Sequence, residues 1–496
     1  MDRHCSGEAG KICSHGLRDE VSQRERRRWA VCLLEALAKA HNILSRGCRN
    51  AFRFGRRVEK RKFYAVQAGA IIAVLTLILA SGGRAASEPR SPRIVTLMMH
   101  FDVDGRDYKV VREAADRFNK SQQDYRVEVS AIDIYYYNER IENAGATGTL
   151  PCLIWIDSPY LYSFAWSGYL RPLDVFAPPE LIRDLLPSIV EQGRYQGRLY
   201  SLGQFDVGLG LWANRRYLRA AGVRIPTVKS PWSLAEFEQA LQRLSKVKGV
   251  DHPLNMSIFM GTPNEFYAFA ITPFLKSFGG DILTHGSTVS ADGALNGPKS
   301  VAAMKRFQSW FINGWAAKDP HGGDSFAGKK AALSWIGAWQ YRSYREALGR
   351  DLVLLPLPDF GRGVKTGIGS WSWGMSSTCR EPVGAWRFLA YLMTPTEILR
   401  ISEADGAIPA RRSVLNKSPF YQRGGPRRVL AEQLEAGYGV RRPQYVNYAL
   451  LSLTLSEAVR AIASGGDVKQ ELDKATLIID NDIAAHNGYH SYAAAK

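Results

Sequence analysis

Three strands alternate with two helices near the start of the main body of this chain. Residues 94–101 and 153–156 are short and apolar throughout, and residues 125–131 alternate apolar with polar side chains. Both patterns are typical of strands. Residues 107–121 carry apolar side chains at helical spacing, and residues 138–144 fit a second, shorter helix. This β-α-β-α-β order predicts a parallel sheet with helices on both faces.

Later segments continue the same α/β pattern. Ser233 and Glu236 form a capping box at the start of an amphipathic helix. Further helices are expected at residues 298–311, 383–393, 426–435 and 449–463, and another begins at Pro395. Because the sequence contains no internal repeat or low-complexity block, we expect one or two compact α/β domains.

The positive charge of the chain is concentrated near its N-terminus. The 496 residues carry a formal net charge of +18. Residues 1–86 contain 17 Lys and Arg against 7 Asp and Glu, which is a net charge of +10. The remaining body is mildly basic and has no Lys/Arg-rich stripe within a recognisable nucleic-acid-binding module. Nucleic acid is therefore not expected as a partner.

Residues 63–83 have no charged side chain, follow a basic cluster and precede a run of small residues. This is the three-part pattern of a secretory signal peptide. We assign it to residues 58–86, with cleavage after Ala85 or Ala86, and expect a periplasmic protein. An uncleaved membrane anchor is the alternative, since 21 uncharged residues can just span a bilayer.

Residues 1–57 form a basic extension that makes this leader longer than usual. Either it is a cytoplasmic extension, or the start codon is assigned too early, with Val58 as the true start; we favour the second explanation. The spacing of Cys5 and Cys13 matches no zinc pattern. Residues 486–496 are expected to be a solvated tail.

The body has two cysteines, Cys152 and Cys379. In an oxidising compartment they could pair, but a separation of 227 positions is weak support for a disulfide. Two free, buried thiols are our preferred expectation.

Catalytic and metal-binding motifs are missing from the sequence. There is no nucleophile elbow, zinc-protease helix, phosphate loop or dinucleotide fingerprint. His486 and His490 are four residues apart and could bind a metal in principle, but a solvated tail is the preferred interpretation. Asp102, Asp104 and Asp133 could supply a glycosidase pair, but sequence alone cannot place carboxylates at the required separation. We expect no catalytic residue, metal or cofactor.

Several segments together resemble the family of bacterial extracellular solute-binding proteins of sugar ABC transporters, the maltose-binding-protein-like group. The segment from Ser167 to Asp174 resembles the family's G-x-L-x-P-L-D stretch, whereas Cys152 stands where the family has Asp and Ala213 where Tyr is usual. In chain order the matching segments are residues 137–151, 157–158, 167–174, 197–200, 211–214, 221–226, 232–244, 279–281, 326–332, 355–358, 385–389 and 406–411. The resemblance covers roughly residues 92–485.

The resemblance implies two α/β lobes, each a mostly parallel sheet flanked by helices, with the ligand in a cleft at the hinge. Residues 92–205 and 374–412 would form lobe one, and residues 206–373 and 413–485 lobe two. Such a protein closes on its ligand and is recognised by a permease in the closed form. The expected partners are a carbohydrate and ABC permease subunits, with the protein acting as a monomer.

A carbohydrate site needs flat aromatic platforms and polar groups with defined hydrogen-bond geometry. The aromatic candidates are Trp339, Trp371, Tyr137 and Tyr160, and the polar candidates are Asp157, Asp206 and Arg411. The backbone at Gly369 and Ser370 is expected to approach the ligand closely. Trp335 and Trp373 are expected in the core, Tyr135 and Tyr136 fit either surface or core, and His100 and Phe101 end the first strand.

The leading hypothesis is a non-enzymatic, substrate-binding component of an ABC importer that captures a carbohydrate. The alternatives are a binder of another polar solute, such as a polyol or glycerol phosphodiester, and, less favoured, a secreted carbohydrate-active enzyme. A phosphate ligand would call for an exposed helix N-terminus or an arginine cluster in the cleft, and the sequence presents neither clearly.

Overall fold

The computed structural model describes residues 91–101, 105–256, 259, 261–285, 289–317 and 324–489. All of them belong to one compact unit, Arg90–Lys496. The predicted N-terminal extension and signal peptide, as well as residues 490–496 of the predicted tail, lie outside the described residues. Within the described ranges, none of the helices is both long enough and apolar enough to cross a membrane.

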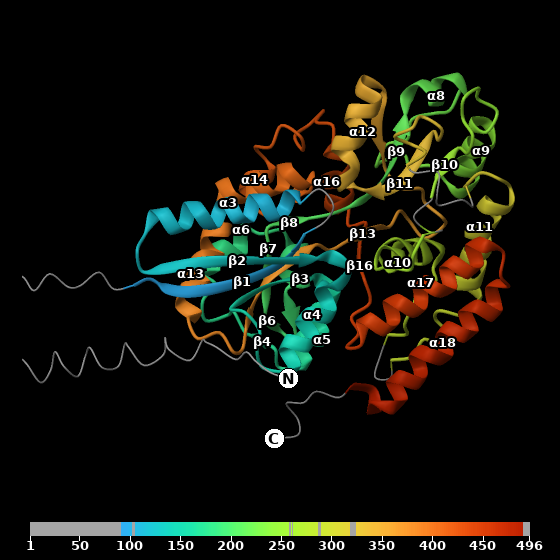
Figure 1. Cartoon of the computed structure of the whole chain (residues 1–496). Coiled ribbons are helices and arrows are strands. Elements are labelled where there is room, and N and C mark those ends of the chain that lie inside the picture. The colour runs from blue at the N-terminus through green and yellow to red at the C-terminus, as the bar shows by residue number, and fades with distance from the viewer. Residues whose placement is uncertain are drawn as a thin grey trace, which may run out of the picture. The chain divides into compact units, whose positions relative to one another are not determined.

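The first lobe is built on a six-stranded mixed sheet (Figure 1). Its strand order is β2-β1-β3-β14-β4, with β7 also paired to β14. The strands are β1 (Arg93–Phe101), β2 (Tyr125–Asp133), β3 (Leu153–Asp157), β4 (Leu170–Arg171), β7 (Ser201–Gly203) and β14 (Trp371–Ser376). The strands β1, β2 and β3 are parallel, as predicted for these three strands, whereas β14 pairs antiparallel with β3, β4 and β7. Since β14 begins at Trp371, residues 371–373 belong to this sheet.

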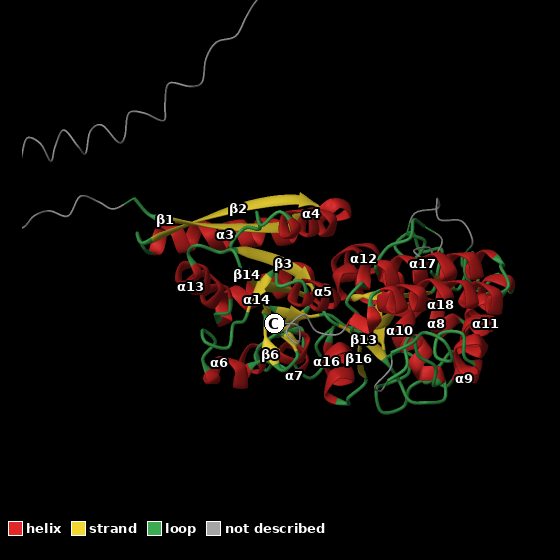
Figure 2. Cartoon of the chain, turned by 90° about the horizontal axis from the view of Figure 1, so that it is seen from below, coloured by secondary structure: helices red, strands yellow, loops and turns green. Residues whose placement is uncertain are grey.

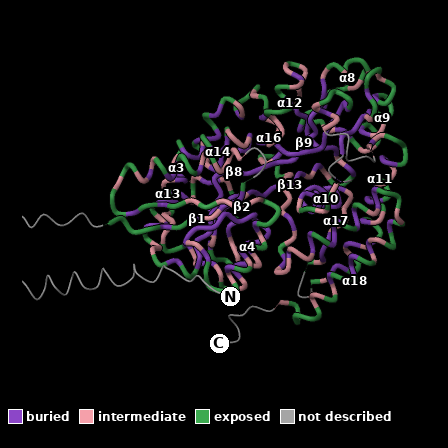
Figure 3. Tube along the Cα trace, in the orientation of Figure 1, coloured by how far each residue is buried: buried purple, intermediate pink, exposed green. Residues whose placement is uncertain are grey.

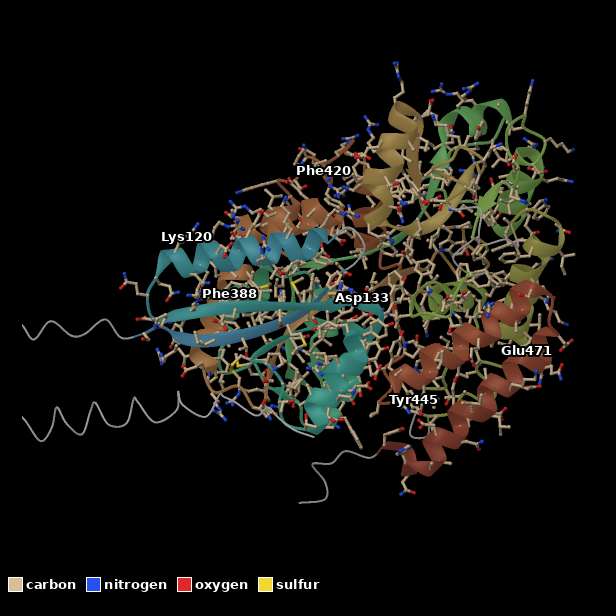
Figure 4. The ribbon with its side chains drawn as sticks, in the orientation of Figure 1. Lys120, Asp133, Phe388, Phe420, Tyr445 and Glu471 are labelled. Carbon is tan, nitrogen blue, oxygen red and sulfur yellow. A yellow bond between two sulfur atoms is a disulfide. The ribbon has the colours of Figure 1, made fainter. Side chains whose placement is uncertain are left out.

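Helices cover both faces of the first sheet. In Figure 1, α3 and α14 lie on one side of the strands and α4 and α5 on the other. The helices of this lobe are α3 (Arg106–Ser121), α4 (Ile134–Ala146), α5 (Leu161–Trp166), α6 (Pro179–Asp184), α7 (Pro187–Gln192), α13 (Pro382–Leu392) and α14 (Pro395–Asp405). The buried face of α3 includes Val111, Ala115 and Phe118, and Phe118 packs edge-to-face on Phe388 of α13, a residue marked in Figure 4.

The second lobe has a four-stranded sheet in the order β10-β11-β9-β12. Its strands are β9 (Leu209–Asn214), β10 (Leu254–Asn255), β11 (Leu333–Gly337) and β12 (Leu352–Leu355). Its helices are α8 (Arg215–Ala220), α9 (Leu234–Leu244), α10 (Phe266–Phe278), α11 (Pro298–Ile312), α12 (Tyr341–Leu348), α17 (Tyr448–Ser464) and α18 (Val468–Ala485). Figure 2 shows this helix-rich lobe beside the first. Figure 3 shows buried strands at the centre of each.

Short strands join the lobes. The strand β8 (Phe205–Asp206) pairs with β15 (Ile408–Pro409), and β13 (Thr366–Ile368) pairs with β16 (Gly439–Arg441). A bridge between Gly208 and Ile368 connects these two crossings. The remaining strands form a two-stranded hairpin of β5 (Arg194–Tyr195) and β6 (Arg198–Leu199). The remaining α-helices are α15 (Arg412–Leu415) and α16 (Arg428–Glu435).

The local sequence signals are confirmed. The hydroxyl of Ser233 accepts a hydrogen bond from the backbone NH of Glu236, whose carboxylate accepts one from the backbone NH of Ser233. This reciprocal arrangement satisfies NH groups that would otherwise be unpaired at the start of α9. All five later helices that were predicted are present, as α11, α13, α14, α16 and α17.

The expectation of two free thiols is wrong, because Cys152 and Cys379 form a disulfide. Cys152 directly precedes β3, and Cys379 lies three residues after β14. The two strands are antiparallel with Met375 opposite Leu153, so the start of one lies beside the end of the other. The pairing register therefore brings together two residues that are far apart in the sequence.

Candidate functional site

The candidate site lies where the carboxyl ends of the strands of the first lobe point toward the second lobe. β1 ends at Phe101, β2 at Asp133 and β3 at Asp157. Figure 4 marks Asp133 at this edge, on the side of α10 and α17. Ligands of open α/β sheets bind outside the carboxyl ends of the strands. We call the residues of both lobes that meet here the interlobe site.

The second lobe contributes Trp339. It lies in a single 3-10 turn, Ala338–Gln340, directly after β11. Its ring packs against Phe266 and Phe269 of α10, with centroids 6.1 and 6.2 Å away, and remains partly exposed. The ring folds back over Gly337, where a Cβ atom would collide with it. Glycine at the end of β11 therefore permits the position of this indole.

The first lobe contributes Trp371, the first residue of β14. Its ring is partly exposed and lies over the imidazole of His100, with the centroids 4.0 Å apart. Trp371 stands opposite Asp157 in the sheet register. An indole that is supported from below and exposed above has the form of a stacking platform.

A buried polar cluster joins the two lobes beside these indoles. Arg442, which follows β16, donates two hydrogen bonds to Asp157 of the first lobe, at 3.0 and 2.7 Å, and one to the hydroxyl of Ser158 at 3.0 Å. It also pairs with Glu265, which precedes α10, at 2.5 Å. The hydroxyl of Tyr448 donates to the same carboxylate at 2.7 Å. Two carboxylates thus share one buried guanidinium.

Contacts run without a break from one indole to the other. Trp339 packs on Phe269, and the guanidinium of Arg442 lies over the same ring, 5.0 Å from its centroid. Arg442 pairs with Asp157, which stands beside Trp371. The interlobe site therefore combines aromatic rings from both lobes with a polar centre.

Burial shifts the pKa values of titratable groups in this region. It raises the pKa of the Glu265 carboxyl against the opposing effect of Arg442. It also raises the pKa of Asp206, although hydrogen bonds from Ser188, Gly369 and Val207 act in the opposite direction. For His100, burial lowers the pKa to about 4.

Asp206 lies in the crossing strand β8, and Gly369 and Ser370 connect β13 to β14. The carboxylate of Asp206 is fully buried and accepts hydrogen bonds from the backbone NH of Val207 at 2.9 Å and of Gly369 at 3.0 Å. The backbone NH of Ser370 donates to the side chain of Gln192 at 3.0 Å. These three residues tie the crossing strands to each other and to α7.

Gly369 also permits a close approach at the polar cluster. Its φ of +128° is in the region that favours glycine. A Cβ atom there would lie 2.8 Å from the Ser158 hydroxyl and 2.9 Å from the Arg442 guanidinium. The glycine thus lets the hinge backbone pass directly under the Asp157–Arg442 pair.

Two other predicted site residues, Tyr137 and Arg411, do not present their side chains to the interlobe site. Tyr137 is fully buried, and its hydroxyl donates to the carbonyl of Met98 and accepts from the backbone NH of Trp155. Arg411 pairs with Asp184 at 2.6 Å and donates to the carbonyl of Met393. Both side chains are occupied within the first lobe.

Tyr160 lies at the interlobe site but is largely buried. Its ring meets that of Tyr448 edge-to-face, with the centroids 5.3 Å apart. Trp335 and Trp373 are buried, as expected for core residues. Tyr135 and Tyr136, at the start of α4, are among the most exposed large apolar residues of the described chain.

Arg442, Glu265 and Tyr448 were not predicted from the sequence. Arg442 stands 285 positions from its partner Asp157, and only the sheet and hinge topology bring the two together. The one local signal is the pair of arginines before Pro443, and such a pair does not by itself indicate a binding site.

One pocket in the described part of the chain borders the cluster. It is lined by Ser158, Pro159, Tyr162, Gln192, Arg441, Arg442 and Gln444, and its volume is about 270 Å³ with its open mouth included. The described residues contain no group of three or more His, Cys, Asp or Glu side chains placed to hold a metal ion. The side chains that meet at the site offer aromatic stacking and hydrogen bonding.

Comparison with known proteins identifies relatives of the same architecture. The chain is 25% identical over 363 residues to an uncharacterized lipoprotein in the oleD 5' region of Streptomyces antibioticus, covering 69% of this chain and 76% of the relative. It is 22% identical over 275 residues to the maltotriose-binding protein of Pyrococcus abyssi, covering 52% and 54%.

Among solved structures, the fold matches the GacH receptor of Streptomyces glaucescens, which was determined unliganded and in complex with acarbose and an acarbose homologue. The TM-score is 0.66 at 19% identity, covering 79% of this chain and 98% of the other. This match supports the two-lobed fold. The family model for bacterial extracellular solute-binding proteins matches residues 113–425, and this chain belongs to that family.

Proposed function

We propose that this protein is the substrate-binding component of an ABC importer and that it captures a carbohydrate at the interlobe site. The observation that carries the proposal is the continuous set of contacts from Trp339 through Phe269, Arg442 and Asp157 to Trp371. It supplies a stacking platform on each lobe and a polar centre between them. The names of relatives that bind maltotriose and acarbose support the same class of ligand.

The chemistry of this set fits a sugar. The C–H faces of a pyranose stack on indole rings, and its hydroxyls both donate and accept hydrogen bonds. Asp157, Glu265 and Arg442 offer both kinds of partner. A ligand that contacts both lobes favours the closed state by its differential affinity for that state.

The charge of the cluster disfavours an anionic ligand such as a glycerol phosphodiester. Asp157 and Glu265 both pair with Arg442, so the one guanidinium is already matched by two carboxyl groups. A phosphate would have to displace them from Arg442, the cation with which both pair. A neutral carbohydrate or polyol can instead share these groups by hydrogen bonding.

The same carboxyl pair is the observation that favours the second candidate, a secreted carbohydrate-active enzyme. Hydrolysis of a glycosidic bond needs one protonated and one ionised carboxyl group, and burial raises the pKa of Glu265. In this protein, however, both groups bond to Arg442 and hold the lobes together. We therefore favour binding and delivery to the permease, by a periplasmic monomer.

Titration calorimetry with maltose, maltotriose and maltotetraose tests this function. We expect one site per chain, the same saccharide recovered intact after prolonged incubation, and binding weakened at least tenfold by Trp339→Ala. Trp386→Ala is the matched control, because Trp386 is also partly exposed but packs on Phe176, in the first lobe. Release of shorter sugars would support the enzyme, and equal effects of the two substitutions would place the ligand elsewhere.

A further inference from the structure

His100 lies at the end of a row of stacked aromatic rings on the first sheet. The rings of Trp373, Trp155 and His100 lie nearly parallel on the neighbouring strands β14, β3 and β1. Their centroids are 5.0 and 5.1 Å apart, with interplanar angles of 12° and 9°. Trp371 covers the imidazole, and Tyr137 meets it edge-on at 5.9 Å. Packing on several sides therefore fixes the orientation of the ring.

Among the described residues, neither nitrogen of His100 has a hydrogen-bond partner. The residue is only 4% exposed, and both Nδ1 and Nε2 are buried without a donor or acceptor. Its polar neighbours at the same edge are satisfied, since Asp157 and Ser158 bond to Arg442. A buried polar group without a partner lowers stability, so it calls for a functional reason.

We propose that His100 selects the ligand by exchanging hydrogen bonds with a hydroxyl of a neutral carbohydrate that binds against the edge of Trp371. This inference rests on the proposed function and names one contact within it. A neutral imidazole has one donor and one acceptor, which matches a sugar hydroxyl. Trp371 lies over the imidazole and is the partly exposed ring of the pair, so the proposed contact requires the indole to turn aside as the ligand binds.

Burial also determines which ligands this contact excludes. Because burial lowers the pKa of His100 to about 4, the imidazole is uncharged at neutral pH. It therefore offers no positive charge to a sugar phosphate or sugar acid. The contact favours neutral saccharides and disfavours analogues that lack the hydroxyl it meets.

His100→Phe tests the proposal, because it keeps an aromatic ring and removes both nitrogens. We expect the variant to bind the best saccharide of the calorimetric series about tenfold more weakly than the wild type, with an equal or higher melting temperature. His100→Gln, which restores a donor and an acceptor, should recover part of the affinity. A residue that serves only to pack the core would lower the melting temperature and leave affinity unchanged.

A series of monodeoxy derivatives of the same saccharide identifies the hydroxyl. One derivative should lose affinity for the wild type but not for His100→Phe, as expected when the two changes remove the same interaction. Equal losses in both proteins for every derivative, or unchanged affinity of His100→Phe, would overturn the role of His100. If the wild type binds none of the saccharides, the proposed function itself is wrong, and the assignment of a sugar hydroxyl to His100 is overturned with it.

Discussion

At the residue scale, the interlobe site combines side chains that bond to one another with one that bonds to none of the described residues. Both terminal nitrogens of Arg442 bond to Asp157 or Ser158, although its Nε has no partner among the described residues, whereas His100 is held by rings alone. The paired groups stabilise the folded chain. The unpaired imidazole destabilises it unless a ligand bonds to it.

This arrangement predicts an acid sensitivity that depends on His100. The ordinary pKa of histidine is about 6.5, and burial lowers that of His100 to about 4. Between these pH values the unfolded chain binds more protons than the folded protein. The free energy of unfolding therefore falls as the pH drops from about 6.5 toward 4.

His100→Phe removes this effect. On acidification from pH 7 to pH 4, the variant should gain stability relative to the wild type by up to about 3 kcal/mol. Urea denaturation of both proteins at several pH values measures the difference. A difference that does not vary with pH would show that the imidazole is not held in its neutral form by burial.

The sequence predicts much of the aromatic part of the candidate site and little of its polar part. Trp339 and Trp371, both predicted as stacking platforms, are partly exposed, one after the end of β11 and the other at the start of β14. Tyr137 sits in a helix whose inner face is not determined by the residues near it in the sequence, and it is buried. Arg442 meets Asp157 only through folding of the whole chain, so no local pattern could indicate this pair.

At the element scale, strands and helices were predictable because their periodicity is local. Which strands pair with one another was less predictable from the sequence. β14 lies between β3 and β4 although it follows them by about 200 residues. The disulfide depends on this register, since Cys152 and Cys379 lie at the adjoining ends of β3 and β14.

The disulfide should stabilise the first lobe. It closes a long loop, and loss of such a crosslink typically costs about 2–4 kcal/mol. We expect the melting temperature to fall when the protein is reduced, and the double variant Cys152→Ser, Cys379→Ser to melt at the lower temperature with or without reductant. Thiol titration of the unfolded protein is the control. An identical melting temperature for the oxidised and reduced wild type would contradict this role.

At the scale of the whole molecule, short crossing strands and the polar cluster join the two sheets, and the buried apolar residues of both lobes form one connected core. The order of elements predicted a parallel sheet flanked by helices, because β-α-β units and short connections allow few topologies, whereas the two lobes were implied by the family resemblance. The positions at which the chain passes from one lobe to the other are set by strand pairings such as β8 with β15 and β13 with β16. These strands are two or three residues long, which is too short for a periodic signal.

The polar cluster makes closure of the lobes an equilibrium that both protein and ligand influence. Asp157 belongs to the first lobe, while Arg442 and Glu265 accompany the second. Breaking the pair by removing one partner leaves a buried charge uncompensated. Arg442→Met should therefore open the lobes in the absence of ligand, and a bound saccharide should close them again.

Small-angle X-ray scattering with and without saturating saccharide tests capture between the lobes most directly. The radius of gyration of ligand-free Arg442→Met should exceed that of the wild type. Adding enough saccharide to saturate the variant should reduce its radius toward the wild-type value. Binding of the saccharide, verified by calorimetry, with no change in the radius of gyration of the variant would contradict capture of the ligand by closure of the two lobes.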